Sequence, residues 1–338
     1  MSHPKANLIS SGEFTYRPIA NWAQWPSDWN VLEVTAVATD SHDRVFVYNR
    51  GDHPVAVFDP EGKLLFSWGE GLFIRPHGIW IGPDDAVYLT DDLNHTVHKF
   101  TAEGRHLFTL GTSGQPSDTG NTSIDYRTIR RSGPPFNFPT NLAVAPNGDL
   151  YISDGYGNAR IHKFSPEGVL QFSWGTPGTG PGQFQVPHGI AIDRNGVVYV
   201  ADRENSRLQL FSPQGEFLTE WTDIARPCEV FIDDVGRVYV AELGYRTGMW
   251  PGTTAPSPDS TGGRISIFDA SGNRLARFGG GERPCEAGDF FSPHDIWLDS
   301  RGSLYVSEVV RSCCGNQRPA VGDYHTLQKL ERIPGVAS

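Results

Sequence analysis

The chain has 338 residues, of which 38% are hydrophobic and 12% aromatic, and it carries 38 glycines and 25 prolines. This composition excludes a disordered chain and favours a large domain of many short strands joined by turns. The net charge of −11 argues against a basic nucleic-acid interface and against attraction to an anionic membrane, so we expect neither partner.

No apolar stretch typical of a signal peptide occurs in residues 1–11, and no run approaches the length of a transmembrane helix. We therefore expect a cytoplasmic protein. The four cysteines are Cys228, Cys285, Cys313 and Cys314. Their late and irregular positions favour free thiols in a reducing compartment, and the adjacent pair could bridge only with strain.

A unit of about forty residues recurs along the chain. Each copy reads as four strands rich in Val, Ile, Tyr and Phe, joined by turns that often contain Gly or Asn. The copies begin near residues 33, 75, 138, 186, 226 and 292. Six such units predict an all-β fold, a six-bladed β-propeller that takes in residues 1–338 as one domain.

Segments outside the repeat also have predicted roles. Residues 13–19 precede the first unit, and we expect them to supply the outer strand of the last blade and so close the ring; a frayed tail is the alternative. Three stretches, 112–135, 244–263 and 311–323, interrupt the period. Loops of this length are usually functional or disordered, and on a propeller they would cover one face or form subunit contacts.

Histidine recurs at one position of the repeat, near the start of the innermost strand. The six units carry Thr35, His77, Thr140, His188, Cys228 and His294 there. The histidines are 111 and 106 residues apart and fall in alternate blades, which are related by about a three-fold rotation. Three imidazoles converging on one axis match a catalytic zinc site with one open position. The alternative is a Pro-His signature that only begins a strand.

A second ring comes from the ends of the second strands. Arg50 and Arg203 occupy the same slot in opposite blades, and each could bind a substrate carboxylate or carbonyl group. The alternative is pairing with a neighbouring acid such as Asp52 or Glu204. Tyr156, in the third unit, could offer a phenol to a metal-bound substrate, or could simply pack in its turn.

Several stretches resemble the NHL-repeat lyases that cleave peptidyl-α-hydroxyglycine. The matching segments are Asn49–His53, Pro76–Gly78, Ser153–Arg160, Val186–His188, Ala201–Arg207 and Pro293–Ile296. The resemblance covers every blade except the fifth and implies a propeller of NHL-type repeats.

By this resemblance, His77, His188 and His294 hold zinc, Tyr156 is the catalytic base and Arg50 anchors or polarises the substrate. Arg203 matches another arginine of the substrate pocket. The resemblance also implies a structural calcium in the channel, bound by the backbone carbonyls of Val37 and Ile79 and by the carboxylate of Asp295, oxygen ligands that suit this ion.

The sequence also departs from that family. The family's disulfide cysteines fall at other residues here, among them Gly157 and Leu210, which agrees with an intracellular protein. The methionine before the family's last Pro-His is Ser292, so we expect Ser292 to alter the substrate pocket. We also expect no copper-dependent hydroxylating domain.

The resemblance thus implies a zinc-dependent lyase that cleaves the C–N bond of a small or short peptide-like α-hydroxyamide. The products would be an amide and glyoxylate or a similar aldehyde. Two alternatives remain open: a metal-dependent hydrolase of a lactone, ester or amide, and a metal-free NHL interaction module. The sequence leaves the oligomeric state open.

Overall fold

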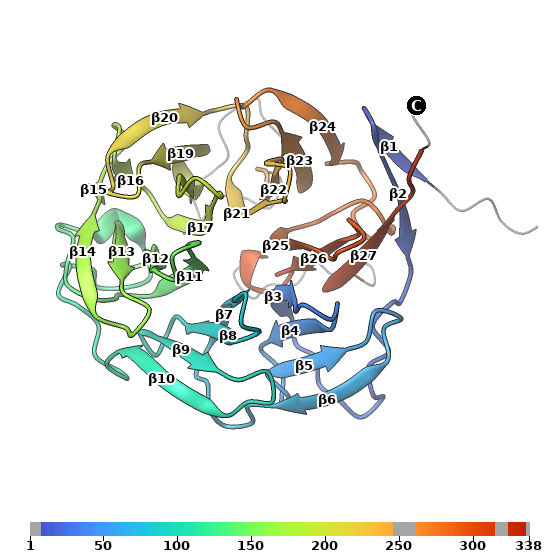
Figure 1. Cartoon of the computed structure of the whole chain (residues 1–338), viewed down its shortest axis with the longest axis horizontal. Helices are drawn as coiled ribbons and strands as arrows, with labels where there is room; N and C mark the ends of the chain where they lie inside the picture. The colour runs from blue at the N-terminus through green and yellow to red at the C-terminus, as the bar shows by residue number, and fades with distance from the viewer. Residues whose placement is uncertain (1–7, 246–260, 315–323, 336–338) are drawn as a thin grey trace, which may run out of the picture.

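The computed structural model describes residues 8–245, 261–314 and 324–335, which form six antiparallel blades around a central axis (Figure 1). The innermost strands, β3, β7, β11, β17, β21 and β25, begin at residues 34, 76, 139, 187, 227 and 293. The predicted all-β six-bladed propeller is confirmed.

The first three blades each contain four strands in sequential order. Blade 1 comprises β3 (Val34–Thr39), β4 (Val45–Asn49), β5 (Val55–Phe58) and β6 (Leu64–Trp68). Blade 2 comprises β7 (Pro76–Ile81), β8 (Val87–Asp91), β9 (Thr96–Phe100) and β10 (His106–Gly111). Blade 3 comprises β11 (Pro139–Val144), β12 (Leu150–Asp154), β13 (Arg160–Phe164) and β14 (Leu170–Trp174).

Blades 4 and 5 follow the same plan, whereas blade 6 is a five-stranded sheet. Blade 4 comprises β17 (Pro187–Ile192), β18 (Val198–Asp202), β19 (Arg207–Phe211) and β20 (Phe217–Trp221). Blade 5 comprises β21 (Pro227–Ile232), β22 (Val238–Glu242), β23 (Arg264–Phe268) and β24 (Arg274–Gly279). Blade 6 comprises β25 (Pro293–Leu298), β26 (Leu304–Glu308), β27 (Leu327–Arg332), β2 (Phe14–Ile19) and β1 (Ile9–Ser11).

Blade 6 joins the two ends of the described chain. β2 pairs antiparallel with β27, with Tyr16 opposite Arg332 and Ile19 opposite Lys329, and β1 pairs with β2 on its outer side (Figure 1). This arrangement covers the edge that β27 would otherwise expose.

Tryptophans at blade edges pack against turn glycines of the following blade. The turn between β9 and β10 contains Gly104 with φ +84°, and a Cβ there would come within 2.6 Å of the Trp68 ring. Gly272, in the turn between β23 and β24, meets Trp221 at the same distance. The left-handed backbone and the indole together require glycine at these turns. Contacts of this kind hold adjacent blades in register around the ring.

The remaining elements are short. They are the parallel pair β15 (Thr176–Pro177) and β16 (Gln183–Phe184) and the 3-10 turns Tyr126–Thr128, Arg203–Asn205 and Ser312–Cys314. Within the described ranges, no helix has the length and apolar character needed to span a membrane. Cys228, Cys285 and Cys313 are free thiols.

Candidate metal centre and substrate cavity

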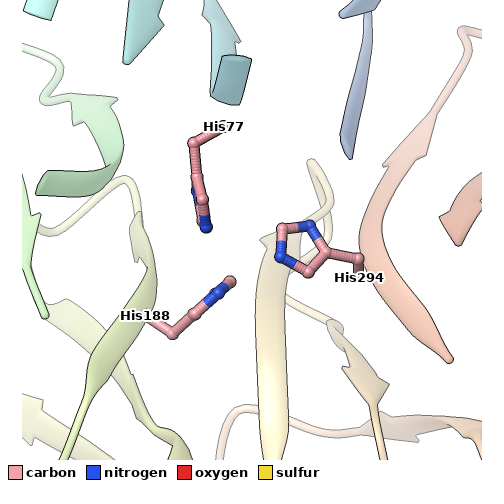
Figure 2. Close-up of side chains that lie close together, drawn as sticks. All are labelled: His77, His188 and His294. Atoms are coloured by element: carbon pink, nitrogen blue, oxygen red, sulfur yellow. The ribbon is translucent and has the colours of Figure 1, made fainter. Parts of the chain in front are cut away.

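The three histidines of the even-numbered blades meet at the propeller axis. His77, His188 and His294 come from β7, β17 and β25, and their rings point toward one another (Figure 2). Ring centroids lie 4.7–4.9 Å apart, and one nitrogen from each ring lies within 4.8 Å of the other two. All three side chains are buried. The structure therefore brings together the three residues predicted to bind zinc.

Each imidazole is oriented by the next blade. The Nδ1 atoms of His77, His188 and His294 lie 2.7–2.8 Å from the backbone carbonyl oxygens of the odd-blade residues Thr140, Cys228 and Thr35. A carbonyl can only accept a hydrogen bond, so each Nδ1 carries the hydrogen and each Nε2 keeps its lone pair. Hydrogen bonds of this kind orient histidine ligands in metalloproteins.

The Nε2 lone pairs outnumber the donors available to them. The Tyr156 hydroxyl lies 3.1 Å from His77 Nε2 and 3.0 Å from His188 Nε2. It has one hydrogen, so it can satisfy only one of these atoms. Nor does His294 Nε2 have a hydrogen-bond donor within the described ranges. Three Nε2 lone pairs therefore converge with too few hydrogen-bond donors to satisfy them. Such an arrangement fits a bound cation such as Zn²⁺.

Burial favours the neutral form of these imidazoles. The pKa values of His77 and His188 lie well below the usual histidine value, mainly because both are buried; neighbouring imidazoles and arginines add to the effect. Burial likewise lowers the pKa of His294 to about 3. Because metal ligation needs an unprotonated imidazole, this environment keeps the three side chains ready to bind metal near neutral pH.

Acidic residues at the ends of the second strands accept hydrogen bonds from the backbone just before the inner strands. Asp202 accepts a hydrogen bond from the Gln185 backbone, and Glu308 accepts one from that of Ser292. In blade 4 the residue before the inner-strand proline, Val186, has φ +61°. A strained backbone fixed by a buried acid sets where the Pro-His pair enters the channel.

A cavity of about 430 Å³ opens over the histidine cluster. It is lined by Leu32, Glu33, Arg50, Arg75, Leu93, Ile124, Tyr156, Arg203, Arg226, Leu243, His294, Val309, Arg311, Ser312 and Cys313. The predicted site residues Arg50, Tyr156 and Arg203 therefore share one cavity with a histidine of the cluster.

The two predicted arginines have different surroundings. Arg203 donates from Nε to Glu204 at 2.9 Å and from Nη1 to the Tyr156 hydroxyl at 3.1 Å. Arg50 donates to Glu33 and to the Pro76 carbonyl. Each guanidinium thus has an acidic partner and also faces the cavity. Arg203 pairs with the acid considered from the sequence, whereas Arg50 pairs with Glu33 and not with Asp52.

Two guanidinium groups lie close to the Tyr156 ring. The Cζ atoms of Arg203 and Arg75 lie 5.1 and 5.9 Å from its ring centroid. Arg203 thus contacts Tyr156 both at its ring face and at its hydroxyl, whereas the Arg75 contact is to the ring. The site can therefore bind a cation, bind an anionic group and move a proton at one hydroxyl.

Ser292 is placed differently from the other predicted pocket residue, Arg203. Its side chain is buried, its Oγ lacks a hydrogen-bond partner within the described ranges, and it is not among the lining residues of the cavity. A substrate contact by Ser292 stays a prediction.

The residues predicted to bind calcium lie further along the channel. Val37 and Ile79 are buried on inner strands, and the Val37 amide donates to Asp295 Oδ2 at 3.2 Å. Burial, with the nearby Glu229 carboxyl, raises the pKa of Asp295 well above its usual range, and burial raises that of Glu229 to about 8. Two buried carboxyl groups that repel each other fit a cation between them.

Several cavity residues were not predicted from the sequence. Arg75 and Arg226 occupy the repeat slot of Glu33, immediately before an inner strand, so extending the repeat comparison by one residue would have found them. Ile124 and Arg311 come from the inserted loops 112–135 and 311–323, which have no repeat equivalents. Residues 246–260 and 315–323, within the predicted insertions 244–263 and 311–323, lie outside the described residues.

Comparison with known proteins identifies the relatives of this chain. The NHL repeat model matches residues 136–164 and 184–211. The chain is 35% identical to the probable peptidyl-alpha-hydroxyglycine alpha-amidating lyase pgal-1 of Caenorhabditis elegans over 75% of this chain and 67% of that protein. It is 34% identical to NHL repeat-containing protein 3 of Mus musculus over 84% of this chain and 80% of that protein.

The chain belongs to the NHL-repeat propeller family that includes these two proteins. It spans only 36% of the length of peptidyl-glycine alpha-amidating monooxygenase B of Xenopus laevis. A gluconolactonase from Xanthomonas campestris has a similar fold, with a TM-score of 0.60 at 13% identity over 98% of this chain and 99% of that one. At this identity, the likeness concerns the fold alone.

Proposed function

We propose that the chain is a metal-dependent lyase that cleaves the C–N bond of an α-hydroxyamide, releasing an amide and glyoxylate or a similar aldehyde. The observation that carries this proposal is the contact of Tyr156 with two histidines and Arg203 beside an arginine-lined cavity. Relatedness to a probable α-hydroxyglycine amidating lyase supports the same reaction class.

His77, His188 and His294 would hold the metal, which we infer to be zinc, through their Nε2 atoms. Bound zinc supplies Lewis-acid chemistry, since it lowers the pKa of a hydroxyl group at its open position. The carbonyls of Thr35, Thr140 and Cys228 hold the imidazoles in the tautomer that this role needs.

The chain's own residues then account for proton transfer and substrate placement. The Tyr156 oxygen accepts the proton of the substrate hydroxyl, while Arg203 stabilises the charge that the phenol oxygen carries. As the C–N bond breaks, the hydroxyl carbon becomes a carbonyl and the departing amide nitrogen takes up the proton that Tyr156 accepted. Arg50 binds the substrate carboxylate beside the reacting carbon.

We also propose a structural calcium bound by the carbonyls of Val37 and Ile79 and by Asp295. Support comes from the buried Asp295–Glu229 pair, whose mutual repulsion a divalent cation would relieve. We expect added Ca²⁺ to raise the melting temperature of the metal-stripped protein, and Asp295→Asn to abolish that rise. No response to Ca²⁺ in the unmodified chain would contradict this site.

The main test combines metal analysis with product detection. We expect purified protein to bind about one equivalent of zinc, and His188→Ala to lose both zinc and glyoxylate release from α-hydroxyhippurate. His162→Ala is the matched control, because His162 is buried outside this cluster. Zinc bound without glyoxylate release, but with turnover in a panel of lactones and esters, would favour the hydrolase instead. If the protein binds no zinc and His188→Ala has no effect, both enzyme functions would be contradicted. The metal-free interaction module would then remain.

A further inference from the structure

The cavity carries more positive than negative charge. Five of its lining side chains are arginines, whereas its lining residues include one acid, Glu33. Two other carboxylates pair with these arginines from just outside the lining: Asp92 with Arg75, and Glu204 with Arg203 and Arg226. Glu204 serves two guanidiniums, so the described residues in this part of the site carry one more positive than negative charge. The imbalance stands out in a chain whose net charge is −11.

Arg311 adds a second excess charge at the cavity. Its backbone N–H donates to Glu33 Oε2 at 3.1 Å, but its side chain has no hydrogen bond or ion pair within the described ranges. Glu33 is already engaged by Arg50, so it does not neutralise Arg311. The Arg311 guanidinium therefore retains its donors for a ligand in the cavity.

Apolar side chains fill out the same cavity. Leu32, Leu93, Ile124, Leu243 and Val309 contribute to its wall. The volume of about 430 Å³ lies at the small end of ligand pockets, which span about 300–1,000 Å³. The cavity therefore suits a small molecule with a short hydrocarbon portion and charged ends better than a long peptide.

We propose that the substrate is a dianion: a small N-acyl-α-hydroxyglycine whose acyl chain ends in a second carboxylate, bound by Arg311. This inference rests on the proposed lyase function, which uses one carboxylate at Arg50. The second carboxylate accounts for the surplus charge, and the short acyl chain accounts for the apolar wall between the ends. A charge-assisted contact with arginine would then select this substrate over a neutral-tailed one.

The test compares two substrates of similar shape. N-succinyl-α-hydroxyglycine carries a terminal carboxylate where N-isocaproyl-α-hydroxyglycine carries a branched methyl end. We expect kcat/KM for glyoxylate release to favour the succinyl compound by about tenfold or more, mainly through KM. Arg311→Gln should reduce that ratio toward unity, and Arg311→Lys should restore part of it. Arg301→Gln, which alters an exposed arginine, should leave the ratio unchanged.

A binding measurement separates this inference from the proposed reaction. The unreactive ligands N-succinylglycine and N-isocaproylglycine can be compared by calorimetry on the metal-loaded protein. If neither α-hydroxy compound is cleaved, the lyase proposal fails, while tighter binding of succinylglycine that depends on Arg311 still supports the charge preference. Equal affinities, or a preference that survives Arg311→Gln, would overturn the dianion proposal even if both compounds are cleaved.

Discussion

At the scale of single residues, the Tyr156 hydroxyl connects the metal centre with the arginines. It contacts two Nε2 atoms and one guanidinium, so Tyr156→Phe removes a proton acceptor with little change in ring packing. We expect kcat for glyoxylate release to fall by about 100-fold or more, because general-base catalysis contributes at least this much. Zinc content should be retained. Tyr151→Phe is the control, since the Tyr151 hydroxyl donates to the Pro213 carbonyl and Tyr151 does not line the cavity. Wild-type turnover in Tyr156→Phe would exclude Tyr156 as the base.

Asp92 gives a second residue-scale prediction, which concerns pH. Its carboxylate oxygens are buried and lack hydrogen bonds within the described ranges, although Arg75 lies 3.0 Å away. Burial raises the pKa of Asp92 to about 6, with Arg75 and Arg50 opposing the rise. The folded chain thus holds this proton at a pH where the unfolded chain has lost it. The Asp92 contribution to the free energy of unfolding is therefore present at low pH and falls as pH rises from about 4 to about 6.

Asp92→Asn should remove this dependence. Relative to the unmodified chain, the variant should gain stability across that pH range by up to about 3 kcal/mol, and the difference should level off above it. Urea unfolding at several pH values measures the difference. Asp118→Asn, at an exposed aspartate, provides the control. A pH-independent difference would contradict the assignment.

At the scale of elements, β2 closes the ring by pairing with β27, which joins the two ends of the described chain. Phe14 on β2 is buried and packs edge-to-face against Tyr239 of blade 5. Phe14→Ala should lower the free energy of unfolding by about 3–5 kcal/mol, as expected for a large aromatic removed from a core. Leu8→Ala, at a residue with 49% exposure, should change it little. Denaturant unfolding would show whether β2 contributes this much.

At the scale of the whole molecule, metal binding should stabilise the folded ring. The three histidines lie on separate blades, so the unfolded chain cannot present them together. An ion that binds only the folded state would add about 4 kcal/mol at a thousandfold excess over its dissociation constant. With Ca²⁺ kept in excess, a zinc-selective chelator should therefore lower the melting temperature of the unmodified protein but not that of His77→Ala. Equal melting temperatures with and without zinc would contradict a metal site at these residues.

The repeat made much of the fold and the centre of the site predictable. In a propeller, a repeat position maps to a fixed distance from the axis, so the slot shared by His77, His188 and His294 indicated where these side chains meet. The same reasoning could have found Arg75 and Arg226. It could not place Arg311, because an inserted loop has no equivalent in the other blades. The hydrogen bond between Arg203 and Tyr156 also required coordinates, since Tyr156 comes from a different blade.

The histidine arrangement has a mechanical consequence. His77 and His294 are 217 residues apart, yet their rings are neighbours on the axis. An ion held there would act as a cross-link between three alternate blades and would restrain outward breathing of the ring. Amide hydrogen exchange in β7, β17 and β25 should then slow together upon metal binding, whereas the outer strands β10, β14 and β20 should respond less.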